Sequence, residues 1–95
     1  MKKQLSICGH DYKLFFKDIE KEEADDNSGY CVVSGNKIVV NKNLPLSQQE
    51  STIIHETIEA INFLFELNLE HNKIMTLETA LYQFLKDNYK INLIK

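Results

Sequence analysis

The sequence predicts an α+β domain in which a small antiparallel sheet of three or four short strands is followed by two packed helices. Residues 1–44 contain runs of β-branched and aromatic residues separated by turn residues, and from Ser47 the apolar positions recur with the period of a helix. The chain has 95 residues, and 43% of them are hydrophobic, which is enough for one packed core without disulfides or a structural metal. We therefore expect residues 1–95 to form a single domain.

Two β-hairpins are expected in the first half of the chain. KQLSICG and DYKLFFKDI, residues 3–9 and 11–19, predict the first hairpin, with a turn over Gly9 to Asp11. YCVVSGNKIVVN, residues 30–41, predicts the second, because glycine and asparagine in its centre tolerate the positive φ of a tight turn. The acidic run EKEEADDNSG between them, residues 20–29, is expected to form a solvated loop or a short frayed helix.

Two helices are expected in the second half. Ser47 and Glu50 have the S-x-x-E spacing of a capping box, which predicts a helix over residues 47–65. A second helix is expected over residues 70–88, and the tail YKINLIK either adds a last strand or forms an ordered extension. Helical spacing predicts the core faces of the two helices. These are Ile54, Ile58, Ile61 and Phe65 in the first helix and Ile74, Leu77, Leu81 and Leu85 in the second.

The composition argues against two classes of partner. The net charge is −3, the basic residues are scattered lysines, and the absence of arginine removes the bidentate group that recognises phosphates and guanine, so we expect no nucleic-acid binding. No apolar run approaches the ~18 residues of a membrane span, and the first apolar run is too short for a signal peptide. We expect a cytoplasmic protein in which Cys8 and Cys31 are reduced, small, buried residues.

A histidine and two glutamates interrupt the most apolar segment, in the sequence HETIE. His55 and Glu59 are four residues apart, so their side chains project from one side of the helix and can reach a common divalent ion. Glu56 points about 100° away around the axis, where it can act as a general base on water without ligating the ion. The pattern therefore predicts the site of a metal-dependent hydrolase. The competing interpretation is a polar patch without any metal.

A catalytic zinc site needs a third protein ligand, and two residues of the second helix compete for that place. The sequence favours His71, which opens the second helix, and leaves Glu78 as the alternative. His55, Glu59 and His71 together offer two imidazoles and one carboxylate, an inventory that suits Zn²⁺. A rival cluster would be formed by Cys8, His10 and Cys31, although these residues lack the C-x-x-C spacing of structural zinc sites.

Four segments together resemble small phage and prophage proteins of the zincin-like metallopeptidase type, distantly related to the ImmA/IrrE and SprT-like peptidases. They are G-x-x-Y-K-L from residue 9, SGYCVVSGNKIVVNKNL, QQESTIIHETIEAINFLFELNLEH and LETALYQFLKDN. The resemblance is most specific around HETIEAIN. It implies a minimal zincin-like fold in which a zinc ion is held between the active-site helix and the next helix.

The resemblance also implies roles for individual residues and the partners to expect. His55 matches the first ligand of the zincin helix and Glu56 matches its general base, whereas Glu59 stands where the usual pattern has a second histidine. We expect a zinc-dependent peptidase that acts on a protein or peptide substrate. The alternative is an inactive zincin-like interaction module, for instance a phage-encoded modulator of a host protein.

Overall fold

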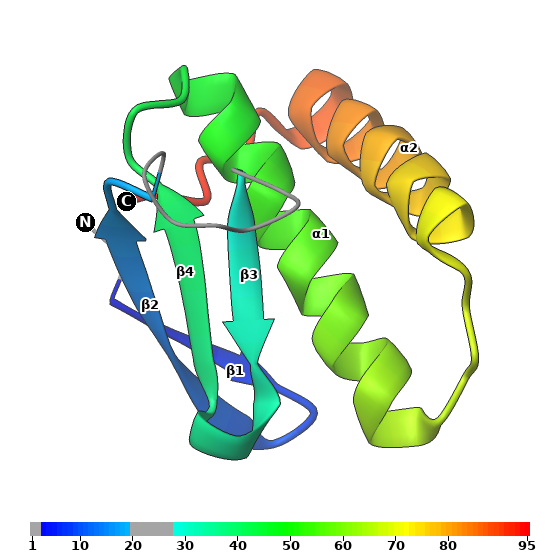
Figure 1. Ribbon diagram of the computed structural model, residues 1–95. Coiled ribbons are helices and arrows are strands. Elements are labelled where there is room, and N and C mark those ends of the chain that lie inside the picture. The colour runs from blue at the N-terminus through cyan, green and yellow to red at the C-terminus, as the bar shows by residue number, and fades with distance from the viewer. Residues whose placement is uncertain (1–2, 20–27) are drawn as a thin grey trace.

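The computed structural model describes residues 3–19 and 28–95, and within them four strands and two long helices form an α+β fold (Figure 1). The strands are β1 (Gln4–Ile7), β2 (His10–Lys17), β3 (Gly29–Val32) and β4 (Lys37–Asn41), and a short 3-10 helix, η1 (Val33–Gly35), joins β3 to β4. The helices are α1 (Leu46–Phe65) and α2 (His71–Tyr89), each beginning and ending within one residue of the predicted bounds. The predicted fold class is confirmed. The acidic run falls almost entirely on residues 20–27, outside the described residues.

The sheet is mixed, with the strand order β1-β2-β4-β3. The two predicted hairpins, β1 with β2 and β3 with β4, are antiparallel, but β2 and β4 pair in parallel, with Leu14 opposite Ile38. The expectation of an entirely antiparallel sheet was therefore wrong for its central pair. The reason lies in β4, where three consecutive apolar residues, Ile38, Val39 and Val40, are buried. A continuous apolar run suits a central strand covered on both faces, so β4 takes that place and leaves β3 at the edge.

Left-handed residues close both hairpins. Cys8 and Gly9 have φ values of 53° and 81°, as a two-residue turn of type I′ requires, so this turn lies one position before the predicted one. Asn36, with φ 49°, ends η1 and leads the chain into β4.

Helix α1 covers one face of the sheet, and α2 packs against the other side of α1 (Figure 1). The approach of α1 to β3 depends on Gly29, because a Cβ atom there would lie 2.5 Å from the Val39 carbonyl oxygen and 2.7 Å from Cγ2 of Thr52. Two apolar clusters result. Tyr12, Leu14, Ile38, Val40, Ile53 and Ala60 belong to the cluster between the sheet and α1, and Ile54, Ile58 and Ile74 form the cluster between the helices. Among the described residues, no helix is long and apolar enough to cross a membrane.

The start of α1 differs from the predicted capping box. Pro45 is the N-cap residue, with no capping hydrogen bond from a side chain, and Glu50 is buried inside the fold instead. The Glu50 carboxylate accepts hydrogen bonds from the Tyr82 hydroxyl at 2.9 Å, the Lys86 ammonium at 2.9 Å and the Leu93 backbone N–H at 3.0 Å. Glu50 therefore joins α1 to α2 and to the C-terminal tail, which is an extension without strand structure.

The core faces of the helices were predicted only in part. In α1, Ile54 and Ile58 are buried and Ile61 packs against the core, but Phe65 is exposed. In α2, Ile74 is buried and Leu85 packs against it, whereas Leu77 and Leu81 are 42% and 43% exposed. These outward leucines contradict the prediction. Glu78, Tyr82 and Lys86 instead reach polar side chains of α1, because buried polar groups require hydrogen-bond partners.

The environment of Glu50 makes the stability of the fold depend on pH. Burial by itself raises the pKa of a carboxyl group, but hydrogen bonds from Leu93, Lys86 and Tyr82 outweigh it and hold the pKa of Glu50 below its ordinary value of 4.5. The reciprocal effect appears at Tyr82, where burial and the bond to Glu50 raise the pKa to about 12. Because the pKa of Glu50 is lower in the folded state, its stabilisation is present above pH 4.5 and lost as the pH falls through the folded value.

We predict that Glu50→Gln lowers the free energy of unfolding at pH 7 by about 2 kcal/mol, because hydrogen bonds to a charged group are replaced by weaker ones. Urea unfolding followed by circular dichroism measures the difference. The gap between wild type and variant should narrow as the pH falls below 4.5, where Glu50 becomes protonated in the wild type. Asp11→Asn, at an exposed position on β2, serves as the control and should change stability little. A gap that stays constant down to pH 2 would contradict this account.

Candidate metal centre

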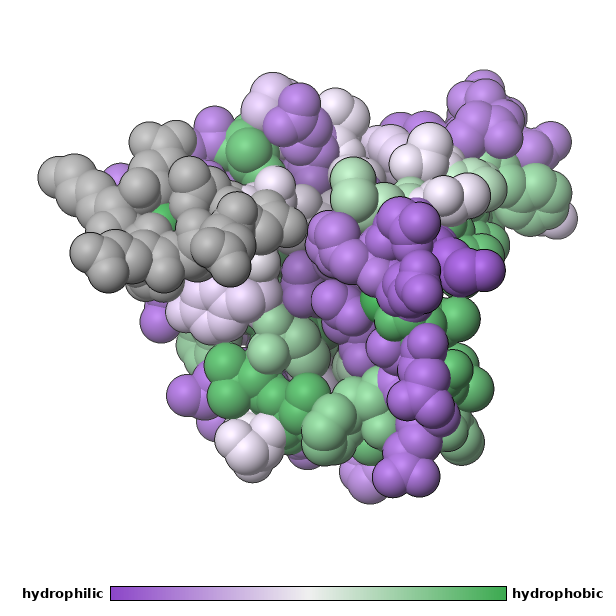
Figure 2. Space-filling view, turned by 45° about the vertical axis from the view of Figure 1, so that its right-hand side comes forward, coloured by the Kyte–Doolittle hydropathy of each residue, from purple (hydrophilic) through white to green (hydrophobic). Residues whose placement is uncertain are grey.

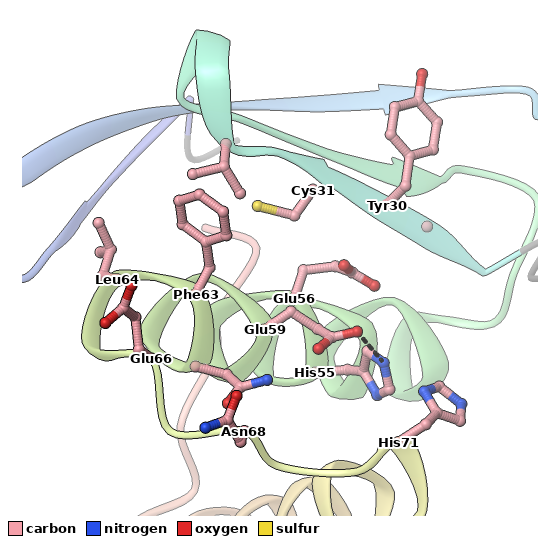
Figure 3. A pocket seen from close by; sticks show the side chains of 13 residues that line it. Tyr30, Cys31, His55, Glu56, Glu59, Phe63, Leu64, Glu66, Asn68 and His71 are labelled. Atoms are coloured by element: carbon pink, nitrogen blue, oxygen red, sulfur yellow. Dashed lines mark ion pairs between the residues drawn. The ribbon is translucent and has the colours of Figure 1, made fainter.

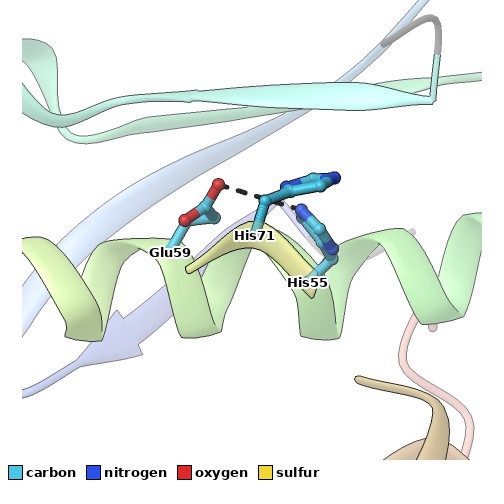
Figure 4. A group of neighbouring side chains, drawn as sticks. All are labelled: His55, Glu59 and His71. Atoms are coloured by element: carbon cyan, nitrogen blue, oxygen red, sulfur yellow. Dashed lines mark ion pairs between the residues drawn. The ribbon is translucent and has the colours of Figure 1, made fainter. Parts of the chain in front are cut away.

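Helix α1 places three polar residues where it passes β3 and α2. His55 and Glu56 are buried, and Glu59 lies one turn further at the rim. The Nε2 atom of His55 is 3.8 Å from Oε2 of Glu59 (Figure 4). The four-residue spacing thus brings the imidazole and the carboxylate together, as the sequence predicted.

The turn between the helices brings a second histidine to the same place. Glu66, with φ 51°, ends α1 in the left-handed conformation, and Oδ1 of Asn62 accepts a hydrogen bond at 2.9 Å from the Leu69 backbone N–H. This contact holds the returning chain against α1, so that α2 begins at His71 beside His55. The two imidazole rings are 5.2 Å apart between centroids and tilted by 65° (Figure 4).

His55, Glu59 and His71 form the only group of three potential metal ligands within the residues that the structure describes. Their ligand atoms all lie within 4.8 Å of one another. Bonds of 2.0–2.1 Å to a tetrahedral zinc ion place ligand atoms about 3.3–3.4 Å apart. The separation of His55 and Glu59 is close to that value, and the exposed His71 side chain can close the remaining distance by rotating. Two imidazoles and one carboxylate therefore fit a zinc-like ion.

Glu78, considered from the sequence as the alternative third metal ligand, lies outside the group of three potential ligands and contacts His55 instead. Its Oε1 atom lies 2.7 Å from Nδ1 of His55, on the opposite side of the ring from Glu59. A carboxylate in this position accepts the Nδ1 proton and leaves the lone pair of Nε2 directed toward the ligand group. Histidines that bind metals commonly have such a carboxylate partner, which fixes their tautomer and orientation.

An open groove of about 1020 Å³ lies between α1 and the edge strand β3 (Figure 3). Glu56 points from α1 into this groove toward β3, and its charge and that of Glu59 act on the thiol of Cys31 across the gap. Burial, together with these two carboxylates, raises the pKa of Cys31 to about 11, so the thiol is protonated at neutral pH. In the space-filling view, hydrophilic side chains gather over the centre of this face, and apolar side chains lie below them (Figure 2).

A second hollow of about 420 Å³ continues on the other side of the ligand group, toward the N-terminal half of α1. His55, Glu56 and His71 line both hollows, so these three side chains lie where the two meet. The first hollow also includes the apolar side chains of Phe63 and Leu64, and the second includes Ser51 and Thr52.

The rival cluster of Cys8, His10 and Cys31 is not among the groups that the described residues bring together. Cys8 lies in the turn after β1 and is exposed, and Cys31 is partly buried in β3. The expectation that both cysteines are buried was therefore wrong for Cys8. The turn explains this, because it directs residues 8–10 to the surface.

Sequence reasoning missed two residues that shape the site. Asn62 was not singled out from the sequence. Its side chain forms hydrogen bonds with the backbone of Leu69 and so holds the turn between the helices, and no sequence pattern indicates such a contact. Cys31 was considered only as a buried residue or as part of the rival cluster. Its alternation with Tyr30 on the predicted strand was the available signal that it faces the helix.

Comparison with known protein families, curated proteins and solved structures finds no match to this chain. The interpretation of the site therefore rests on its own geometry.

We predict that Glu78→Leu changes the tautomer of His55. In the wild type, the neutral form of the His55 ring should carry its proton on Nδ1, and loss of the Glu78 acceptor should let the proton move to Nε2. Long-range ¹H–¹⁵N NMR of the histidine rings measures the change. Thr79→Leu adds the same side chain at the exposed neighbouring position and should leave the His55 signals unchanged. An Nε2-protonated ring in the wild type would contradict the assigned role of Glu78.

Proposed function

We propose that this protein binds a divalent metal ion, with Zn²⁺ the best match, and hydrolyses a peptide bond in a protein or peptide substrate. The observation that carries the proposal is the convergence of His55, Glu59 and His71, with ligand atoms within 4.8 Å, at the meeting point of two hollows. The hydrogen bond from His55 to Glu78 supports the proposal, because it prepares one nitrogen of the ring for a ligand.

The chain offers a separate residue for each task of hydrolysis. His55, Glu59 and His71 would hold the ion, which supplies Lewis-acid polarisation and makes water more acidic. Glu56 is the general base, because its buried carboxylate lies next to the ligand group in sequence and projects into the groove (Figure 3). The same carboxylate can then pass the proton to the leaving amine.

The edge strand β3 indicates how an extended substrate would bind. β3 is the last strand in the sheet order, and Gly29, Tyr30 and Cys31 line the groove opposite α1. An extended peptide can add to such an edge through backbone hydrogen bonds while its side chains enter the hollows on either side of the ligand group. This binding mode explains why both hollows meet at His55.

The second candidate is a metal-binding interaction module without turnover. Glu59 favours it, because a carboxylate ligand leaves less positive charge on the ion than a histidine and makes bound water less acidic. Such a module would use the same groove to hold a partner protein.

We predict that the wild-type protein binds one equivalent of Zn²⁺ and that His55→Ala, Glu59→Ala and His71→Ala each weaken binding by at least about tenfold. Isothermal titration calorimetry with Zn²⁺ alone, together with native mass spectrometry, measures affinity and stoichiometry. His10→Ala is the matched control, because His10 is exposed on β2 and lies outside the ligand group. Absence of stoichiometric binding to the wild type would leave only a polar patch and end the proposal.

We predict that Glu56→Gln retains Zn²⁺ affinity within about threefold and lowers peptide hydrolysis by at least about 100-fold, because a general base contributes 10²- to 10⁴-fold. A fluorogenic peptide library with the zinc-loaded protein measures turnover, and Asp11→Asn is the carboxylate control. Equal hydrolysis by wild type and Glu56→Gln would contradict the assigned base. Stoichiometric zinc without hydrolysis by the wild type would instead support the interaction module.

A further inference from the structure

Helix α2 presents an apolar stripe on a side that does not face α1. Leu77, Leu81 and Phe84 are 42%, 43% and 49% exposed, and they follow the i, i+4, i+7 spacing of one helical face. Ala80 is also exposed and lies beside them, one residue before Leu81. We call these four residues the α2 seam. A seam of this spacing is the surface that a second helix packs against.

We propose that the α2 seam binds the same seam of a second copy of this chain, with the two α2 helices antiparallel about a two-fold axis near Ala80. The charged residues at the ends of the seam carry the argument for this occupant. Lys73 and Asp87 lie equally far from Ala80 in sequence, and both are exposed. A two-fold axis at Ala80 therefore places Lys73 of each copy opposite Asp87 of the other.

The helical period supports the same arrangement. With 3.6 residues per turn, Lys73 and Asp87 lie on the same flank of the seam, and antiparallel helices bring equal flanks together. Glu70 and Lys90, which flank the helix at its two ends, are also symmetric about Ala80 and opposite in charge. In a parallel pair Lys73 would instead lie at the level of Lys73 of the other copy, far along the helix from Asp87, so the Lys73–Asp87 pairs could not form. The charges thus select an antiparallel second copy.

The side chains of the seam fit this pairing in size. The small Ala80 at the axis allows close approach of the two helices, and the Phe84 ring of one copy can lie beside Leu77 of the other. Phe84 also contacts Tyr89 within its own chain, with ring centroids 5.8 Å apart, so the apolar surface extends toward the end of the helix. The seam is only about 10 Å long, at 1.5 Å per residue, so we expect a dimer of micromolar affinity.

Dimerisation through the seam leaves the candidate metal centre accessible. His71, Met75 and Glu78 line the second hollow from a different side of α2 than the seam. The inference therefore stands independently of the proposed function, and a failure of one says nothing about the other.

The test is the mass of the protein in solution, measured by sedimentation velocity up to about 100 µM without added metal. The wild type should form dimers. Lys73→Asp and Asp87→Lys should each raise the dissociation constant at least about tenfold, because each places like charges opposite one another twice. The double variant K73D/D87K restores both pairs and should return the dissociation constant to within about threefold of the wild type.

A second variant tests the apolar part of the seam. Leu81→Lys should give a monomer with unchanged helical circular dichroism, whereas Leu46→Lys, at an exposed apolar position on α1, should remain dimeric. A wild type that is monomeric throughout the concentration range would overturn the proposal. So would a dimer that ignores Leu81→Lys, or a double variant that stays as weak as the two single variants.

Discussion

Two buried polar side chains of α1, Glu50 and His55, determine how α2 packs. A buried charge or donor without a partner costs several times the net gain of an ordinary hydrogen bond, so the second helix must supply partners. It does so with Glu78 for His55 and with Tyr82 and Lys86 for Glu50. These three residues are spaced by four along α2 and therefore share one face. Ile74 is the only fully buried residue of that helix, so polar contacts outweigh apolar ones in setting its rotation.

The rotation of α2 has two consequences at opposite sides of the helix. On the inner side, it brings Glu78 to Nδ1 of His55 and so leaves Nε2 facing Glu59. On the outer side, it turns Leu77 and Leu81 to the surface, where they create an apolar stripe. The candidate metal centre and the α2 seam therefore have a common origin in the polar side chains of α1.

The parts of the fold that depend on local pattern could be predicted from the sequence, and the parts that depend on pairing between distant segments could not. Helical spacing located α1, α2 and the pair His55 and Glu59, because these contacts lie within one or two turns of the chain. The parallel pairing of β2 with β4 depends on which strand of a hairpin becomes central, which a single strand pattern does not specify. The capping box failed for the same reason, because Glu50 finds stronger partners 32 to 43 residues away.

The surroundings of Glu50 and of His55 differ in how the negative charge of their carboxylates is balanced. At Glu50 the chain provides its own cation, Lys86, and the pKa of Glu50 is correspondingly low. Around His55 the ion pairs that the structure describes for Glu59 and Glu78 are both with the His55 ring rather than with a lysine. Several carboxylates held close to one another repel, and in a partly buried site this repulsion is screened weakly by water. Under the proposed function, a divalent cation held between Glu59 and the two histidines would remove that repulsion and would neutralise Glu59 as Lys86 neutralises Glu50.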